Sequence, residues 1–289
     1  MKAHEKCYSV ERLARVLGVS RSGYYAWRNR PVSEREMANR QLMTQIRAIH
    51  QQSHGIYGSP RVFHELRAEG SACGRHRVAR LMRREGIQGR QKRRFRRTTV
   101  RNPHDPVAPN LLRDLGEPQA PDQVWVSDVT YIRTGEGWLY LAGIMDRFSR
   151  TIVGWAMGEH PDAALTCRAL QMAILRRRPQ PGLLHHSDRG SHYTADKYRK
   201  LLAKHQFRAS MSSTGNCYDN AHKESFFATL KSELIYHCDL DTRMTARQHI
   251  FAYIEGFYNT RRRHSSIGYL SPGDFELAWQ AQISSVSTF

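Results

Sequence analysis

The pattern of the last two thirds of the chain constrains the fold most. Residues 122–157 contain three expected strands in succession, and residues 161–236 then alternate helices with short apolar strands. Strands joined by tight turns pair antiparallel, whereas strands separated by helices pair in parallel. The sequence therefore predicts an α/β domain with a mixed sheet and helices on both faces.

The expected elements of this part follow from apolar periodicity and from the turn residues between them. Gly135 and Gly137 mark the turn of a hairpin between the first two strands. Strands are expected at residues 124–132, 138–145, 151–157, 182–186 and 207–211. Helices are expected at residues 161–177, 194–205, 219–236 and 245–261.

The first third of the chain is helical in pattern and strongly basic, with candidate helix-turn-helix units at residues 9–27 and 36–87. In the first unit, Gly18 suits a left-handed turn and Ser20 can cap the following helix. Such units often bind DNA, but a small three-helix bundle with solvated basic faces would give the same pattern.

The second unit has its own helix signals. Ser59 is expected to cap a helix that has Pro60 at its first position. A further helix, basic on one side, is expected over residues 75–82.

Composition divides the chain into three parts. Residues 1–101 form the helical region, the proline-rich segment 102–121 is a predicted linker, and residues 122–289 form a predicted catalytic core with a basic C-terminal helix and tail. Residues 83–101 hold nine Lys or Arg and one Glu, including Arg93 and Arg94. This run is either a solvated face or a tether that follows a phosphate backbone.

The chain is strongly basic as a whole. Among its 289 residues, Lys and Arg outnumber Asp and Glu by 45 to 26, a difference of 19, and the pI is about 10.2. This balance favours a polyanionic partner, above all nucleic acid. A ribosomal-type protein, or an enzyme with one basic tail, would show a similar charge.

Cysteine usage and hydropathy indicate a cytoplasmic protein. The five cysteines form no Cys-x-x-Cys pair, which fits free thiols in a reducing compartment and makes a zinc site improbable. No apolar run approaches the roughly 18 residues of a membrane span. A soluble chain in the bacterial cytoplasm, associated with the nucleoid, is expected.

Acidic side chains in a basic domain are the candidates for catalysis. Asp128 lies within an apolar strand, on the same face as Val124 and Val126. Asp188 follows a short buried strand, where α/β sites are commonly built. Glu224 lies in a predicted helix, on one face with Asn220 and Lys231.

Spacing alone does not select these three. Asp146 and Asp219 are rivals of the same kind, and a single acidic residue more often forms an ion pair or a turn. His185 and His186 are further candidate ligands, but adjacent strand residues point to opposite faces, so at most one can face a site.

A resemblance does select them. The segments VWVSDVTYIRTGEGWLYLAGIMDRFSRTIVGWAM, LLHHSDRGSHYTA, SSTGNCYDNAHKESFFATLKSEL and FYNTRRRHSSIGYLSPGDFE occur in this order and span most of the chain. They resemble the integrase-core transposases of two-frame bacterial insertion sequences, and among these the product of the second frame, OrfB. That family is related to retroviral integrases.

The resemblance implies a ribonuclease-H-like fold, with a five-stranded mixed sheet, and an Asp-Asp-Glu catalytic triad. By position the triad is Asp128, Asp188 and Glu224, and the 35 residues between the last two have the family's spacing. The triad would hold two Mg²⁺ ions, with Mn²⁺ as a substitute. Lys231 matches a basic residue that contacts DNA near the active site, and Asn220 shares its helix face.

The resemblance also implies the reaction. Water would cleave a phosphodiester at an element end, and the freed 3′-hydroxyl would attack target DNA, through joined ends in a circular intermediate. Departures from the family are mild: His192 stands where glutamine is common, and His222 and Lys223 replace smaller or apolar residues.

The basic C-terminal segment is a second candidate DNA contact. Arg261, Arg262 and Arg263 follow a predicted helix. They are either a solvated helix end, favoured by the helix dipole, or a DNA-binding motif, as the resemblance suggests.

Partners and alternatives remain at this stage. The expected partners are terminal repeats, target DNA, further copies of the chain in a homo-multimer, and the first-frame product or a frameshift fusion with it. A ribonuclease-H-like nuclease or resolvase would share the triad. A non-catalytic helix-turn-helix regulator would need no triad.

Overall fold

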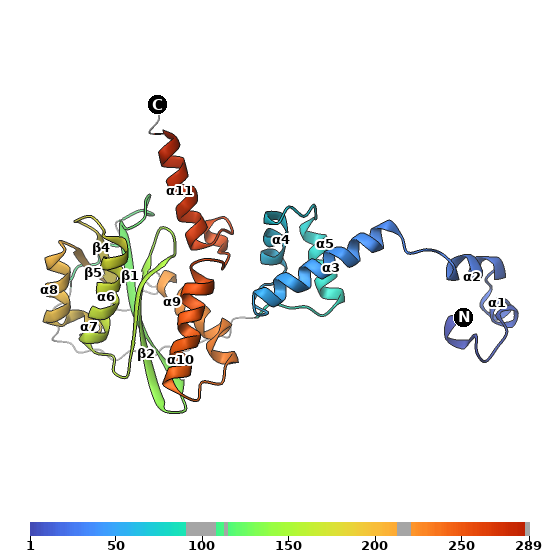
Figure 1. Ribbon diagram of the computed structural model, residues 1–289, viewed down its shortest axis with the longest axis horizontal. Helices are drawn as coiled ribbons and strands as arrows, with labels where there is room; N and C mark the ends of the chain where they lie inside the picture. Colours follow the sequence, from blue (N-terminus) through green and yellow to red (C-terminus); the bar gives the residue numbers. More distant parts are fainter. Residues whose placement is uncertain (91–107, 113–114, 213–220, 287–289) are drawn as a thin grey trace.

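The computed structural model describes residues 1–90, 108–112, 115–212 and 221–286, with the backbone alone for residues 221–225 and 286. The predictions for Arg93, Arg94, Asp219 and Asn220, and those for the side chains of His222, Lys223 and Glu224, lie outside the described residues. Figure 1 shows an α/β body flanked by helices, with a helical region at one side.

The N-terminal region consists of helices. They are α1 (Val10–Leu17), α2 (Arg21–Arg28), α3 (Glu34–Gln52), α4 (Ser59–Ala68) and α5 (Arg75–Arg84), after a 3-10 turn at Lys2–His4.

The pair α1 and α2 forms as the sequence predicts. Gly18 adopts a left-handed conformation with φ 65° between the helices. The Ser20 hydroxyl accepts a hydrogen bond from the Gly23 N–H at 3.0 Å and so caps α2. The pair lies at the far end of α3, away from the body (Figure 1).

Helices α3, α4 and α5 pack on one another through buried side chains such as Ile46, Leu66 and Leu81. The predicted start of α4 is wrong by one residue. Gly58 precedes the helix, Ser59 is its first residue, and no side chain caps this end. Pro60 stays in the first turn, where its missing N–H costs no hydrogen bond.

The sheet confirms the predicted architecture. Its strands are β1 (Val124–Thr134), β2 (Gly137–Asp146), β3 (Ile152–Gly158), β4 (Leu184–Ser187) and β5 (Arg208–Met211). Their order is β3-β2-β1-β4-β5. The pairs β1–β2 and β2–β3 are antiparallel, and the pairs β1–β4 and β4–β5 are parallel. This is a mixed five-stranded sheet.

Helices cover both faces of this sheet (Figure 1). They are α6 (Ala163–Arg177), α7 (Ser191–Thr194), α8 (Asp196–Lys204), α9 (Ala221–Glu233) and α10 (Arg243–Phe251). A further helix, α11 (Pro272–Val286), projects beyond the sheet. A π-helix, η4 (Ala252–Tyr258), continues α10, and short 3-10 turns lie at Ile235–His237 and Ser265–Ile267. Within the described parts of the chain, no helix is both long and apolar enough to cross a membrane.

Three helix predictions need correction. The helix expected over 194–205 is α8, which begins two residues later, and the short helix α7 before it was not expected. The helix expected over 245–261 is α10 followed by the π-helix. The C-terminal tail contains α11, which carries no basic residue in its last turn, so the expected basic helix and tail is basic only before α11.

Alternate residues of β1 enter two different cores. Trp125 packs with residues of α6 and α8, such as Leu165 and Tyr198. Val124 and Val126 face the other side, where Phe226 of α9 lies. The predicted alternation along this strand is therefore confirmed.

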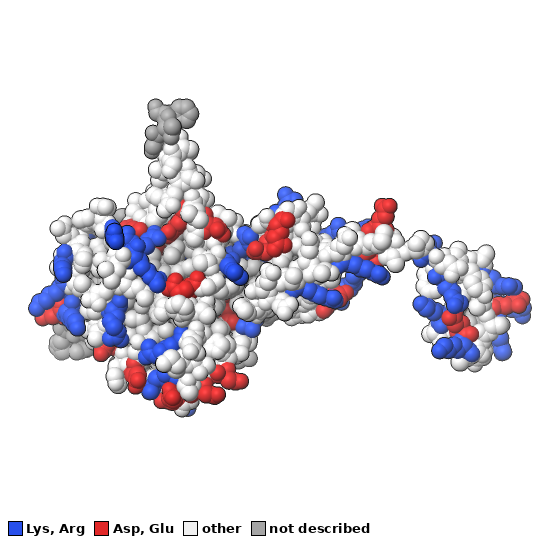
Figure 2. All heavy atoms as spheres, viewed as in Figure 1, with Lys and Arg blue, Asp and Glu red and all other residues white. Residues whose placement is uncertain are grey.

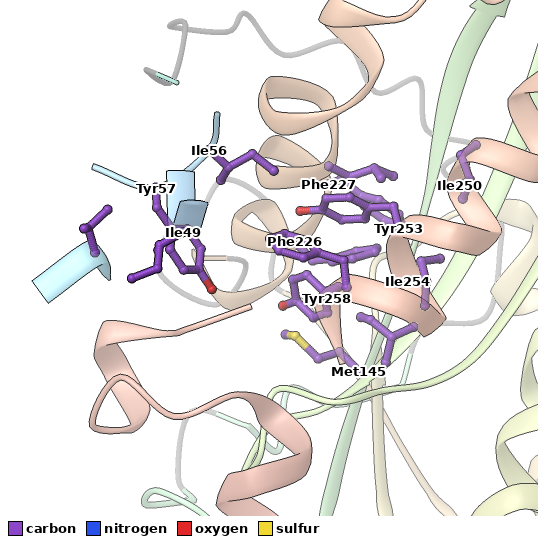
Figure 3. Packing of buried hydrophobic residues seen from close by; sticks show 14 of the residues in the cluster. Ile49, Ile56, Tyr57, Met145, Phe226, Phe227, Ile250, Tyr253, Ile254 and Tyr258 are labelled. Carbon is purple, nitrogen blue, oxygen red and sulfur yellow. The ribbon is translucent and has the colours of Figure 1, made fainter. Parts of the chain in front are cut away.

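The second of these cores continues into the N-terminal helical region. Ile49, Ile56 and Tyr57 belong to the same buried cluster as Phe226 and Tyr253. Figure 3 shows these side chains gathered between the end of α3, α9 and the π-helix. The helical region thus packs against α9 and the π-helix, on the side of the sheet that carries Asp128.

Candidate active site

Asp128 lies near the middle of β1, on the face covered by α9. Its partner across the ladder is Gly143 of β2. The two residues line a hollow together with Val126, Phe226 and Phe227, among others. One carboxylate oxygen of Asp128 accepts a hydrogen bond from the next residue's backbone N–H at 2.8 Å. The carboxylate is partly exposed, so it can accept further ligands.

Gly143 allows α9 to approach the sheet at this point. A Cβ atom added to Gly143 would lie 3.2 Å from Cζ of Phe227. That separation is tighter than ordinary van der Waals contact, so a larger residue would move the ring. The glycine therefore helps to place α9 close to Asp128.

Asp188 is the first residue after β4, and extending the β1–β4 pairing by two residues places it opposite Asp128. The last ladder pair between β1 and β4 joins Val126 to His186. Two residues further along each chain lie Asp128 and Asp188, and neighbouring strands are roughly 5 Å apart. Their backbones therefore leave adjacent points of one sheet.

The loop that carries Asp188 is held by several hydrogen bonds. The Asp188 carboxylate accepts the N–H of Gly190 at 2.9 Å. The Arg189 Nε donates to the carbonyl of Ser212, which follows β5, at 2.8 Å. These bonds fix the carboxylate where β4 ends and α7 begins.

Tyr193 lies close enough to Asp128 and Asp188 for both charges to affect the pKa of its hydroxyl. This residue was not among those predicted from the sequence. Its side chain is fully buried, and burial together with the nearby Tyr198, Asp128 and Asp188 raises the pKa of its hydroxyl well above the usual range. Its only sequence signal was its place in the stretch after Asp188. Both carboxylates therefore lie near one neutral phenol.

His192 also lies beside Asp188. Burial lowers the pKa of its imidazole, although the Asp188 carboxylate acts in the opposite direction. A Cβ added to Gly190 would meet both the His192 ring and an Asp188 oxygen within 3.0 Å. A larger residue at position 190 would therefore displace the His192 ring or the Asp188 carboxylate.

Glu224 belongs to α9, but its side chain is outside the described residues. The position of α9 over the sheet is shown by the contacts of residues that follow Glu224 in the helix. Phe226 and Phe227 line the hollow with Asp128. Lys231 lies over the ring of Tyr131 at 4.8 Å. Burial lowers the pKa of its ammonium group, and the charge of Asp128 offsets only part of this shift. The helix therefore crosses the sheet face that carries Asp128.

The rival Asp146 has a structural role. It is fully buried at the end of β2, where its carboxylate accepts the N–H groups of Asp122 and Ser149 and the Ser149 hydroxyl at 2.8–3.0 Å. Burial raises its pKa to about 6, against these hydrogen bonds. Trp125 pairs with Asp146 and Asp128 pairs with Gly143, so the Asp146 carboxylate belongs to a ladder position three residues from that of Asp128.

The two candidate histidines are accounted for by hydrogen bonds inside the fold. His185 Nε2 pairs with the Tyr198 hydroxyl at 2.9 Å, and His186 Nδ1 pairs with the Ser210 hydroxyl at 2.8 Å. Among described side chains, no group of three or more His, Cys, Asp or Glu is arranged for a metal ion.

The three C-terminal arginines have different environments. Arg261 is exposed. Arg262 is only 3% exposed, and its guanidinium donates to both carboxylate oxygens of Glu233 at 2.7 Å. Arg263 donates to Glu65 of α4 and to the Tyr269 carbonyl. The burial of Arg262 favours a structural role for this residue, whereas DNA contact by the exposed Arg261 stays a prediction.

Comparisons with known families agree with this geometry. Models described as "Integrase core domain" match residues 118–217 and 205–272, and a model described as "HTH-like domain" matches residues 37–95. The helical match covers α3 to α5.

Relatives match along nearly the whole chain. The insertion element IS600 31 kDa protein of Shigella sonnei is 48% identical over 263 residues, which cover 91% of this chain and 97% of the relative. The transposase InsF for insertion sequence IS3A of Escherichia coli K12 is 41% identical over 278 residues, or 96% of each chain. A chain in a simian T-cell lymphotropic virus intasome structure has a TM-score of 0.47 at 12% identity and covers 79% of this chain and 73% of that one.

These relatives favour a transposase over the nuclease and regulator alternatives. With its integrase core and its helix-turn-helix-like region, the chain belongs to the family of insertion-sequence transposases that includes InsF, and it is a polynucleotidyl transferase that acts on DNA.

Proposed function

We propose that Asp128, Asp188 and Glu224 form the catalytic centre of this transposase. The observation that carries the proposal is the β1–β4 register, which starts two of the carboxylates from adjacent points of one sheet. Packing of Phe226 and Phe227 beside Asp128 supports the third assignment, because it brings α9 over the same point.

The donor set suits divalent cations of the magnesium type. Carboxylate oxygens are the ligands that Mg²⁺ prefers, and Asp128 and Asp188 are both partly exposed and flanked by polar backbone. We propose that Asp128, Asp188 and Glu224 would hold two Mg²⁺ ions, with Mn²⁺ as a substitute. When bound, the ions would stabilise the charge on the attacking and leaving oxygens.

The residues of the chain then have distinct tasks. The carboxylates position the scissile phosphodiester for in-line attack, first by water and then by the freed 3′-hydroxyl. Burial of Tyr193 keeps its hydroxyl protonated beside two carboxylates, so it adds no negative charge to the site. Lys231 lies at the rim of the site, near Asp128 and Tyr131, where its ammonium group can meet a DNA phosphate.

DNA recognition is proposed for the helical region. In a three-helix unit of this kind the last helix enters the major groove, and here α5 exposes Arg75, Arg80 and Arg83. Lys and Arg side chains are spread over this region and over α1 and α2 in Figure 2. We propose residues 1–101 as the DNA-binding part, 102–121 as the connection and 122–289 as the catalytic part.

Two further expectations remain proposals. Joining two element ends requires both to be held at once, so we propose that several copies of the chain assemble on DNA. We also propose that the first-frame product, alone or as a frameshift fusion, adds end-recognition contacts, and that the enzyme works at the nucleoid in the cytoplasm.

The triad is tested with oligonucleotides that carry an element end, incubated with Mg²⁺. Asp128→Asn, Asp188→Asn and Glu224→Gln should each lower end cleavage and strand transfer by at least 100-fold, on the order expected when a metal ligand is lost.

Asp196→Asn changes an exposed carboxylate on α8 and should leave activity unchanged. Asp146→Asn should lower stability but not the activity of the folded fraction. Cleavage by Glu224→Gln at the wild-type rate would refute the assignment.

A further inference from the structure

Glu233, the last residue of α9, is the centre of a buried ion-pair network. The residue is 6% exposed. Its carboxylate accepts two hydrogen bonds from Arg262 and one from the Tyr253 hydroxyl, all at 2.7 Å. Arg61 lies 3.5 Å from the same carboxylate, and Arg90 donates to the backbone carbonyl of Glu233.

The partners of Glu233 come from two separate parts of the chain. Tyr253 and Arg262 belong to the π-helix and the loop after it, on the catalytic side. Arg61 lies in α4 and Arg90 follows α5, so both belong to the helix-turn-helix-like region. The C-terminal end of α9 is therefore held jointly by the catalytic body and by the DNA-recognising helices.

An unpaired carboxylate would be unfavourable at this position, both because it lies at a helix C-terminus and because it is buried. A negative charge at a helix C-terminus is repelled by the helix dipole. Burying an ion costs several kcal/mol unless it is paired and hydrogen-bonded. The arginines reverse both effects, because they neutralise Glu233, and Arg90 also satisfies a terminal carbonyl of α9.

Neighbouring contacts make this junction rigid. The Tyr57 hydroxyl donates to the Arg261 carbonyl and accepts the Arg263 N–H, both at 3.0 Å. His64 of α4 stacks on Tyr269 with ring centroids 3.9 Å apart. A displacement of α4 would therefore shift both residues 261–269 and, through Arg61, the C-terminal end of α9.

Glu224 is nine residues before Glu233 in the same helix, about 13 Å along its axis. We propose that Glu233 is a positioning residue, through which Arg61 and Arg90 set the placement of α9, and with it Glu224, according to the seating of the DNA-binding helices. The proposal rests on the assignment of Glu224 to the catalytic centre. It makes the DNA-binding region part of the active-site scaffold.

Arg61→Met isolates this connection. Arg262 still pairs with both oxygens of Glu233, so the carboxylate stays neutralised and the fold is retained. We expect kcat for end cleavage to fall about tenfold, since small displacements of a catalytic group are costly, while KM for end DNA stays unchanged. The Mg²⁺ concentration for half-maximal rate should rise, because one ligand is misplaced.

Three companion variants complete the experiment. Arg61→Lys keeps the charge and should restore most of kcat, and Arg90→Met should show the same kcat and Mg²⁺ effects as Arg61→Met. Arg199→Met breaks an exposed pair with Asp196 on α8, outside the helical region and the candidate site, and should change neither kcat nor the Mg²⁺ dependence. Thermal unfolding shows whether each variant is folded. If Arg61→Met does not fold, the kcat and Mg²⁺ dependence of Arg90→Met test the proposal instead.

The outcomes separate this proposal from the catalytic assignment. Unchanged kcat and Mg²⁺ dependence in folded Arg61→Met and Arg90→Met would overturn the role of Glu233. A purely higher KM would also overturn it, since the arginines would then act in DNA binding. Failure of the triad itself would be seen separately, as full activity of Glu224→Gln.

Discussion

Identical neighbouring residues can have opposite roles, as the three arginines after the π-helix show. Arg262 neutralises a buried carboxylate, whereas Arg261 is exposed. The sequence RRR contains nothing that distinguishes them, because burial of one member depends on how the loop folds back on α9. Sequence alone could therefore predict a basic DNA-binding segment but not its contacting residue.

The difference between these arginines can be measured by the salt dependence of DNA binding. Arg261→Gln should lower the slope of log K against log salt by about one unit, because one phosphate contact is lost. Arg261→Lys keeps the charge and should keep the slope. Arg262→Gln should mainly lower the melting temperature, since it leaves Glu233 buried with weaker pairing. An equal loss of slope in folded Arg262→Gln would contradict the structural role given to that residue.

Glu233 should make stability depend on pH in the acid range. Burial raises the pKa of its carboxyl, but hydrogen bonds and charge from Arg262, with the Tyr253 hydroxyl, bring it below the ordinary value of 4.5. The stabilisation is therefore complete above about pH 4.5 and is lost as the pH falls through the lower, folded-state pKa. The difference in melting temperature between the wild type and Glu233→Gln should be largest near pH 6 and should shrink towards pH 3.

Circular dichroism between pH 3 and 7 measures this difference. Glu11→Gln provides the control, because Glu11 is exposed on α1 with only a loose partner in Arg15. Its melting temperature should follow the wild type at every pH. A Glu233→Gln deficit that stayed constant with pH would show that packing, and not charge, stabilises this position.

At the scale of elements, the periodicity of apolar residues predicts the strands, because their bounds depend on the local sequence. The five strands appear within about two residues of their expected bounds, because alternation and turn residues fix them. The adjacency of Asp128 and Asp188 also follows once β1 and β4 are known to be parallel. Choosing these carboxylates over Asp146 required the resemblance, since all three lie in or beside strands.

Elements that depend on tertiary contacts were missed. The π-helix is held at its end by Asn259, whose amide group exchanges two hydrogen bonds with the backbone of Ile152 in β3. Helix α11 is docked by contacts to distant residues, with Phe275 and Trp279 against Phe148. Neither set of contacts has a signature in the local sequence.

The ion pairs of Glu276 should account for much of the docking of α11. Its carboxylate accepts two hydrogen bonds from Arg177 of α6, at 2.6 and 3.1 Å, and one from the Thr151 hydroxyl. Arg177 also pairs with Asp122. Glu276→Ala should lower the free energy of unfolding by about 2 kcal/mol, because partly exposed Arg177 then loses one of two carboxylates.

Urea unfolding of the full chain measures this loss. Gln280→Ala, one turn later on an exposed position of α11, should change stability by less than about 0.5 kcal/mol. If the two variants were equally stable, the aromatic contacts to Phe148 would be sufficient to dock the helix.

At the scale of the whole molecule, the feature that the sequence did not predict is the docking of the helical region. Tyr57 lies in a buried cluster with Phe226, and Arg61 and Glu65 pair with residues near the other end of the chain. Composition predicted the helical region and the core as successive parts. It could not predict their packing, which depends on complementary shape and on charges that are far apart in the sequence.

This docking predicts a strict relation between the DNA sequence that is recognised and the bond that is cut. Because buried residues of α3 to α5 belong to the same cluster as those of α9, we expect the recognition helices and the catalytic carboxylates to keep a fixed relative position. Inserting 5 bp between the recognised segment and the cleavage site of an element end turns one relative to the other by about half of a 10.5-bp helical turn. Cleavage at the element boundary should then fall at least tenfold, while binding of the end in a gel-shift assay persists.

A matched substrate with five substituted base pairs in the same interval, and no change in length, should be cut normally. A shift of cleavage by 5 bp, to the bond that now occupies the original distance, would also agree with a rigid body. Undiminished cleavage at the displaced boundary would instead require the recognition helices to swing relative to the sheet. The Tyr57, Arg61 and Glu65 contacts would then have to break in each catalytic cycle, and the positioning of α9 through Glu233 would fail with them.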